Sequence, residues 1–353
     1  MNEPGARPRS LGALEAFIAS LPRLAIGIFP TPLVRLDRLS DELGIDLWLK
    51  RDELSGLALG GNKTRKLEFV LADARARGYR TVVTVGPLTS NHTMMTAAAA
   101  RRCGFDVHCV IGSERPARAA GNLLLTEYLG ATLHFAPMDF ATPTVVEQER
   151  LQELCDRVVA ATGGYWIPGG GTMPEAEPGY MEAVAEIARQ RAGRWDFDHF
   201  VAAFGTGSTT TGLLLGIALA GLDVFVHAVA VSSRHAIEEV FRRPPPARLF
   251  LDSAAHFGFG FTAADVPAHE IVFGYGEAGY GVPTPDADAA LRVVAGREGY
   301  FLDPVYTAKA FAGLLGRVRE GSIPRGSRVL FLHTGGLSMT PAAEKRYAHP
   351  IDL

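Results

Sequence analysis

The sequence has few cysteines and no excess of either charge, and these shortages exclude several classes of protein. The chain has 353 residues and only three cysteines, Cys103, Cys109 and Cys155. They form no C-x-x-C pair and leave one over in any pairing, so we expect a reduced, cytoplasmic protein and no disulfide scaffold. Lys and Arg number 35 against 38 Asp and Glu, which predicts no nucleic-acid partner.

Long apolar runs and two common hydrolase motifs are also missing. The longest apolar run, Gly212 to Leu222, is too short to cross a bilayer, so no membrane partner is expected. There is no G-x-S-x-G elbow and no H-E-x-x-H motif, so serine-hydrolase and zinc-protease chemistry lack support, and no metal site is predicted.

Short strand-like runs alternate with Ala-rich amphipathic stretches, a pattern typical of parallel α/β sheets. Six strands are predicted, at 80–86, 106–112, 131–136, 198–204, 224–231 and 328–332. Four helices are predicted, at 67–75, 94–102, 122–129 and 213–220. The strands fall into two series, which predicts two α/β lobes with a small-molecule site in the cleft between them.

Two Gly/Pro-rich segments separate these elements. Pro168 to Gly179 is the predicted linker between the two lobes. Arg242 to Pro246, with the sequence RRPPP, is expected to form an exposed turn with no role in recognition.

The segment Gly60 to Lys66, GGNKTRK, nearly spells a phosphate-binding P-loop, but Asn62 separates the glycine from Lys63. A P-loop needs these two residues adjacent, so an NTPase is disfavoured. Lys63 is then either a surface lysine at a helix start or a lysine that the Gly-Gly turn directs into a cleft, where it could form a Schiff base.

The segment Gly205 to Gly212, GTGSTTTG, follows a predicted strand and precedes a helix. A dinucleotide fingerprint needs glycine at its sixth position, where this chain has Thr210, so NAD binding is disfavoured. Hydroxyl groups at a helix start suit a single terminal phosphate, and the alternative is a plain turn with capping threonines.

Two further segments carry polar residues at turns. Gly86 to His92 contains Ser90 and Asn91, which by themselves predict only helix capping. The C-terminal part has three more segments, Gly279 to Gly281, Asp303 to Thr307 and His333 to Gly336. Taken singly, these are turns that contain buried tyrosines.

Together the segments resemble the pyridoxal-phosphate enzymes of fold type II, specifically the family of D-cysteine desulfhydrase and 1-aminocyclopropane-1-carboxylate deaminase. The resemblance runs from Phe29-Pro-Thr-Pro-Leu33 to Thr334-Gly-Gly336 and covers most of the chain. Its most specific parts are Gly60 to Phe69 and Asp303-Pro-Val-Tyr306.

This resemblance implies two open parallel-sheet lobes, as in the tryptophan synthase β fold, with pyridoxal 5'-phosphate in the cleft between them. The larger, cofactor-binding domain would comprise residues 1–65 and 176–353, and the smaller α/β domain residues 66–175. The family also suggests a homodimer.

The resemblance assigns roles to individual residues. Lys63 would hold the cofactor covalently, Asn91 would hydrogen-bond its ring hydroxyl, and Thr334 would approach its pyridine nitrogen. The cofactor phosphate would lie on a loop formed by Gly205, Thr206, Gly207, Ser208 and Thr209. The substrate would contact Ser90, Asn91, His92, Tyr280 and Tyr306. Ser90 and the two tyrosines would join Lys63 as catalytic residues.

The sequence departs from the family pattern near these residues. Thr89 replaces a common glutamine, Met94 and Met95 stand where polar Arg and Gln are usual, and Ser208 replaces a glycine of the phosphate loop. We therefore expect the side of the pocket that binds the substrate carboxylate to be altered.

The resemblance predicts a lyase that catalyses α,β-elimination on a small cysteine-like amino acid. Thr307 follows Tyr306, as in the desulfhydrase pattern, where the deaminase pattern has a glutamate that keeps the pyridine nitrogen protonated. The first alternative is 1-aminocyclopropane-1-carboxylate deaminase. The second is a pyridoxal-phosphate-binding protein without turnover, against which the intact Lys63, Ser90, Tyr280 and Tyr306 argue.

Overall fold

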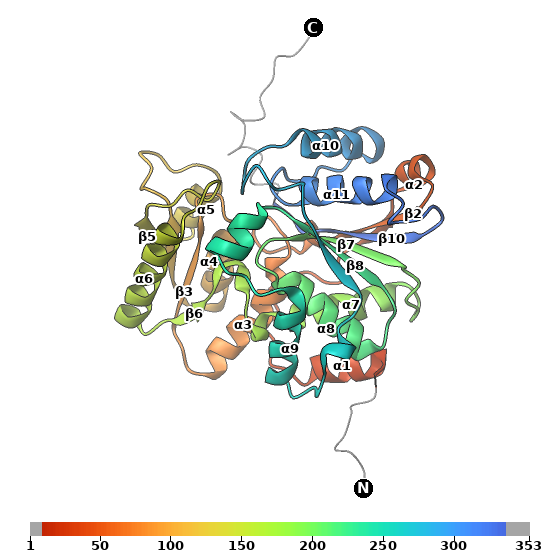
Figure 1. The fold of residues 1–353 in the computed structure, drawn as a ribbon. Coiled ribbons are helices and arrows are strands. Elements are labelled where there is room, and N and C mark those ends of the chain that lie inside the picture. Colours follow the sequence, from red (N-terminus) through yellow and green to blue (C-terminus); the bar gives the residue numbers. More distant parts are fainter. Residues whose placement is uncertain (1–8, 337–353) are drawn as a thin grey trace.

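Two separate sheets form the framework of the computed structural model, which describes residues 9–336 (Figure 1). The larger sheet has the strand order β1-β2-β10-β7-β8-β9. In that order the strands are Leu33–Arg35, Asp46–Arg51, Arg328–His333, His199–Phe204, Phe225–Ala230 and His269–Val272. The smaller sheet has the order β5-β4-β3-β6, with strands Thr132–Ala136, Asp106–Gly112, Thr81–Pro87 and Tyr165–Ile167.

All six predicted strands are present, each within one residue of its predicted ends. The prediction of parallel sheets is confirmed except at β1, which pairs antiparallel with β2. Strands β1, β2, β6 and β9 are absent from the predicted set. Strands β1 and β6 have only three residues each, too few to show a period of two.

Helices cover both faces of the larger sheet. Helices α1, α7, α8 and α9 pack on one face, and they span Leu11–Ala19, Pro178–Gln190, Ser208–Ala220 and Pro246–His256. Helices α2, α10 and α11 pack on the other face, and they span Asp37–Leu43, Pro285–Glu298 and Thr307–Arg319. Strands β7, β8 and β10 are therefore buried on both sides, as their nearly continuous apolar sequences require.

The smaller sheet is covered in the same way. Helices α3, α4 and α5 lie on one face, and they span Lys63–Ala76, Asn91–Cys103 and Gly121–Tyr128. Helix α6, Val145–Thr162, covers the other face. Helix α3 also packs against α7 of the larger lobe, so it lies where the two lobes meet (Figure 1).

The predicted linker connects β6 of the smaller sheet to α7 of the larger lobe. It contains two short helices, η2 at Gly169–Gly171 and η3 at Pro174–Ala176. The domain boundaries after residues 65 and 175 remain a prediction, and the outermost residues of the predicted larger domain, 1–8 and 337–353, lie outside the described residues.

Three helices begin earlier than the apolar pattern predicts. Helix α3 starts at Lys63 and not at residue 67, α4 at Asn91 and not at 94, and α8 at Ser208 and not at 213. Their first turns are polar, and hydrophobic periodicity cannot distinguish a polar helical turn from a loop. Residues of the predicted site therefore occupy helix N-termini, where backbone N–H groups are free to bind a ligand.

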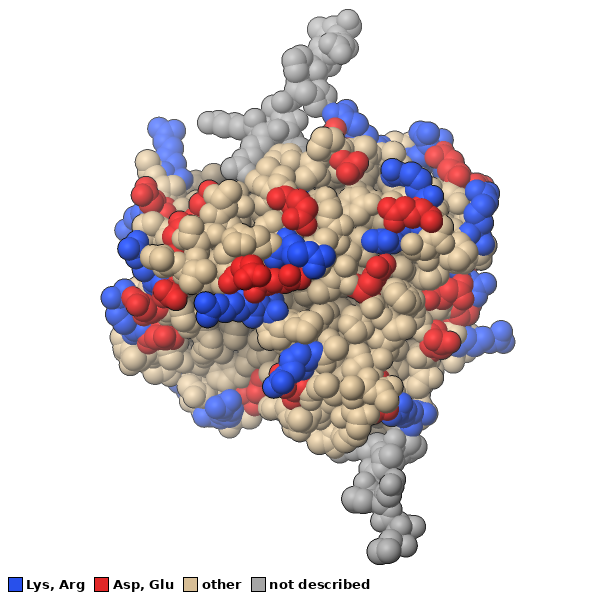
Figure 2. All heavy atoms as spheres, viewed as in Figure 1, with Lys and Arg blue, Asp and Glu red and all other residues tan. Residues whose placement is uncertain are grey.

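The surface seen in Figure 2 carries basic and acidic side chains intermixed, with no large area of one sign on that face. Among residues 9–336, no helix combines the length and apolar character needed to span a membrane.

Candidate active site

A cavity of about 230 Å³ lies between the lobes, at the starts of helices α3, α4, α8 and α11. Ten of the twelve predicted site residues line it: Lys63, Ser90, His92, Gly205, Thr206, Gly207, Thr209, Tyr280, Tyr306 and Thr334. Asn91 and Ser208 do not line it. Residues from widely separated parts of the chain thus meet at one place, as the cleft prediction requires.

A tight glycine turn directs Lys63 into this cavity. Gly60 has φ +71°, and a Cβ atom there would lie 1.8 Å from the backbone oxygen of Glu53, so only glycine fits. The Asn62 N–H donates to the Thr334 backbone oxygen over 3.0 Å. The turn is thereby fixed to the end of β10, and Lys63 follows as the first residue of α3.

The environment of Lys63 makes its amine easy to deprotonate. Burial lowers the pKa of Lys63 to about 8, and a hydrogen bond with Lys66 opposes this shift. Burial, together with the nearby charge of Lys63, holds the pKa of Lys66 well below its usual range. A lysine with a lowered pKa is a better nucleophile and base near neutral pH. Lys66, which is not among the predicted site residues, also lines the cavity.

The start of helix α8 forms a cradle of hydroxyl groups. Gly207 has φ +101° and precedes the helix, and Thr206, Thr209 and Thr210 line the cavity. Within the described part of the chain, the buried Thr210 Oγ1 and Ser208 Oγ have no hydrogen-bond partner. Free hydroxyls and helix-start N–H groups together suit a phosphate.

Ser90 both lines the cavity and caps helix α4. Its Oγ accepts the Thr93 N–H over 3.1 Å, so the capping interpretation is correct. Capping uses an oxygen lone pair and leaves the hydroxyl able to donate toward the cavity. The two roles are therefore compatible.

The neighbours of Ser90 differ in their exposure to the cavity. The Asn91 Oδ1 accepts from Asn122 Nδ2 over 2.8 Å, which engages the side chain outside the lining. His92 lies in the lining, with Nε2 2.8 Å from the Thr84 hydroxyl oxygen and a buried Nδ1 that lacks a partner in the described residues. Burial and the charges of Lys63 and Lys66 hold the pKa of His92 well below its usual range, so the ring is neutral.

Tyr280 and Tyr306 form the opposite wall. Their hydroxyl oxygens are 2.7 Å apart. Burial raises the pKa of Tyr280 to about 12 and that of Tyr306 well above its usual range. Both hydroxyls are therefore protonated near neutral pH, and because one donates to the other, the pair keeps one O–H to donate elsewhere.

Two expectations about neighbouring residues need correction. Thr307 is fully buried outside the lining, and its hydroxyl donates to Asp303 Oδ1 over 2.7 Å. Of the two threonines considered for the pyridine nitrogen, only Thr334 lines the cavity.

Met94 and Met95 pack in the core of the smaller lobe, because they lie on the inner face of α4, so they do not shape the pocket wall directly.

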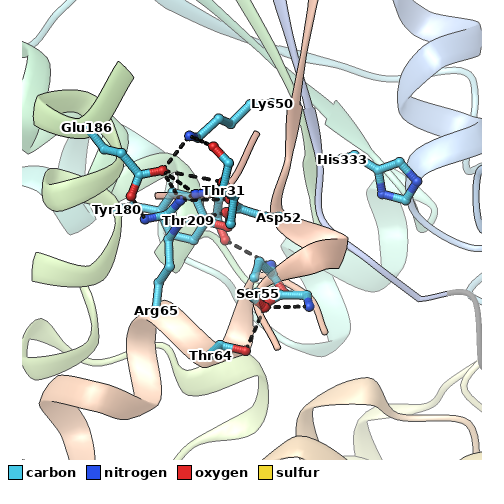
Figure 3. A network of polar contacts seen from close by, with 12 residues as sticks. Thr31, Lys50, Asp52, Ser55, Thr64, Arg65, Tyr180, Glu186, Thr209 and His333 are labelled. Atoms are coloured by element: carbon cyan, nitrogen blue, oxygen red, sulfur yellow. Dashed lines mark hydrogen bonds and ion pairs between the residues drawn. The ribbon is translucent and has the colours of Figure 1, made fainter. Parts of the chain in front are cut away.

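A network of buried charges outside the cavity lining fixes the start of α3 (Figure 3). Arg65 donates two hydrogen bonds to Asp52, both over 2.8 Å, and two to Glu186, over 2.8 and 3.0 Å. Lys50 also pairs with Glu186, and Tyr180 donates to Asp52 over 2.8 Å. Two cations thus face two carboxylates, and the network joins helix α3 to β2 and α7.

Comparison with known proteins shows the family to which the chain belongs. The family model described as "Pyridoxal-phosphate dependent enzyme" matches residues 24–335. The chain belongs to this family. It is 36% identical to a D-cysteine desulfhydrase from Yersinia pestis over 326 residues, which cover 92% of this chain and 96% of that protein.

Solved structures give the same result. The crystal structure of an ACC (1-aminocyclopropane-1-carboxylate) deaminase homologue superposes with a TM-score of 0.80 at 33% identity, covering 95% of this chain and 98% of that chain. A threonine deaminase from Solanum lycopersicum has the same fold, with a TM-score of 0.66 at 17% identity, covering 95% of this chain and 88% of that chain. The protein is a fold type II, pyridoxal-phosphate-dependent enzyme of the desulfhydrase and ACC deaminase type.

The residues present fit this cofactor. The unpartnered hydroxyl of Thr210 and the N-terminus of α8 suit its phosphate, and the amine of Lys63 suits its aldehyde. When bound, pyridoxal phosphate withdraws electrons from the α-carbon of an amino acid.

Several lining residues lie outside the predicted set. Gln148 and Gln152 come from one face of α6, and Phe140 comes from the loop before it. Arg243 also lines the cavity and is half-buried, so the expectation of an exposed turn is wrong for this residue, whereas Arg242 is exposed as predicted. A repeated Arg-Arg gives no local signal of which side chain turns inward.

Proposed function

We propose that this enzyme catalyses α,β-elimination on a cysteine-like amino acid, in which the substrate and one water molecule give a 2-oxo acid, ammonia and the protonated β-leaving group. The observation that supports this choice over cyclopropane ring opening is the chemistry of the cavity wall. Among residues 9–336, no Asp or Glu lines the cavity, and the neutral Thr334 does. A hydroxyl stabilises a protonated pyridine less than a carboxylate does, which favours reactions whose carbanion is discharged quickly.

In this proposal each residue has a defined task. Lys63 holds the cofactor and moves the proton at the α-carbon, since its lowered pKa suits a general base. The Gly205–Thr209 loop binds the cofactor phosphate. Ser90 orients the substrate, and the protonated pair Tyr280 and Tyr306 donates toward the leaving group. The cytoplasmic location and the homodimer remain parts of the proposal. The three unpaired cysteines support a reducing compartment.

A comparison of substrates tests this function. We expect β-substituted amino acids with good leaving groups, such as D- or L-cysteine and β-chloroalanine, to be converted to 2-oxo acids. We expect 1-aminocyclopropane-1-carboxylate to be a poor substrate by kcat/KM, because its ring opening provides no quick discharge of the carbanion. Comparable kcat/KM values for it and the best β-substituted substrate would favour the deaminase. No turnover of any substrate, with cofactor bound, would favour the non-catalytic alternative.

Ser90 provides a second test. Ser90→Ala is expected to lower kcat by about 10²-fold, because it removes a hydroxyl that orients or protonates the substrate. It also removes a helix cap, which costs about 1 kcal/mol of stability. Ser90→Asp restores a capping oxygen without the hydroxyl, so it should recover the melting temperature and leave kcat low. If Ser90→Asp recovered both, Ser90 would act only as a cap.

A further inference from the structure

The cavity extends beyond the groups assigned so far, toward α6 and a short helix, η4, at Ala236–Val240. The walls of this extension are largely apolar, and the aromatic rings in them contact one another. The Phe140 and Phe241 rings stack with centroids 5.9 Å apart, and Phe140 lies 6.1 Å from the Tyr280 ring. The extension is therefore continuous with the side of the cavity where Tyr280 would meet the substrate.

Arg243 lies in this apolar extension without an acidic partner. It is half-buried and lines the cavity, and its guanidinium lies over the Phe241 ring, 5.4 Å from the centroid. Within residues 9–336, no ion pair or side-chain hydrogen bond engages it. Burial alone lowers the pKa of Arg243, with no nearby carboxylate to oppose the shift. The contrast is Arg65, whose guanidinium is paired with two carboxylates.

Arg243 is one of three basic residues that line the cavity, and the proposed reaction gives it no role. Lys63, Lys66 and Arg243 line it, and none of the described lining residues is acidic. Lys66 lies beside the phosphate cradle, because its Nζ is 3.4 Å from the Gly170 backbone oxygen and Gly170 packs against Thr206. Arg243 comes from a different segment, next to Phe241. A half-buried cation that faces a ligand site and has no acidic partner is desolvated at a cost that an anionic ligand would offset.

We propose that Arg243 binds a second anionic group, a carboxylate or sulfonate, at the far end of the substrate side chain. This inference rests on the proposed function and refines its substrate class: cysteine-like amino acids whose β-substituent ends in an acid. A guanidinium binds such a group through two parallel hydrogen bonds. The aromatic walls formed by Phe140 and Phe241 accommodate the carbon atoms between the β-carbon and the acid.

The test uses two substrates of nearly equal shape, S-carboxymethylcysteine and S-carbamoylmethylcysteine, each as both enantiomers. The measured quantity is the ratio of kcat/KM for the acid to kcat/KM for the amide. Comparing this ratio between enzyme variants cancels the difference between the two leaving groups. We expect Arg243→Gln to lower the ratio by about 10–100-fold, the range for loss of hydrogen bonds to a charged group. Arg243→Lys should retain part of the preference.

Arg242→Gln is the matched control, because it removes the same charge from the adjacent, exposed position and should leave the ratio unchanged. An unchanged ratio in Arg243→Gln, with turnover intact, would overturn the inference and leave the proposed function standing. Weaker binding of pyridoxal phosphate with an unchanged ratio would overturn it too, by assigning Arg243 to the cofactor phosphate. If no variant showed turnover, the proposed function would fail. The dissociation constants of the acid and the amide, measured by calorimetry for the wild type and for Arg243→Gln, would then still test the role of Arg243.

Discussion

Lys63→Ala is expected to lower kcat by about 10²–10⁴-fold or more, because it removes both the covalent attachment of the cofactor and the base at the α-carbon. The glycine turn and the burial that lowers the pKa of Lys63 to about 8 prepare this one amine for both tasks. The variant should still fold, since the Lys63 side chain faces a cavity and forms no ion pair within the described residues.

Peptide mapping by mass spectrometry after borohydride reduction measures the attachment directly. We expect the cofactor mass on the peptide containing Lys63 in the wild type and on no lysine in the variant. Lys309 is an internal control: burial also lowers its pKa to about 8, but its amine donates to the Val231 and Gly279 backbone oxygens and does not line the cavity. A reducible adduct at Lys66 or Lys309 in Lys63→Ala would show that the assignment to Lys63 is wrong.

Arg65→Met is expected to lower the free energy of unfolding by about 3–5 kcal/mol, because it leaves buried carboxylates without their partner. Arg65 is nearly fully buried, and Asp52 and Glu186 each accept two of its hydrogen bonds (Figure 3). Methionine matches the length of the arginine stem, so the main loss is electrostatic. Because Lys63 is two residues away on α3, loss of this support should also weaken cofactor binding.

Urea unfolding, followed by fluorescence and circular dichroism, measures this effect where the two transitions coincide. The control is Arg248→Met, which breaks an exposed ion pair with Asp252 and should cost only about 0–1 kcal/mol. Equal losses in the two variants would contradict a structural role for the buried network.

The residue pattern by itself determined six of the ten strands in residues 9–336 and their division into two series, and the family resemblance supplied the predicted site residues. Strands such as 106–112 were predicted closely because parallel strands buried on both faces are short apolar runs, a local signal. The glycine turn at Lys63 and the strand-to-helix turn at Gly205–Thr209 are encoded by neighbouring residues, and the family resemblance then assigned their roles. Local chemistry of this kind needs no knowledge of distant contacts.

Only the tertiary structure decided which side chains meet. Arg65 pairs with Glu186, 121 residues later, and no local pattern encodes that distance. The same holds for Thr307, which is bound to Asp303 and kept out of the cavity, and for Arg243, which turns inward while Arg242 stays in solvent. The direction of a polar side chain depends on the partners and the space that the fold brings to it, and these come from parts of the chain far away in sequence.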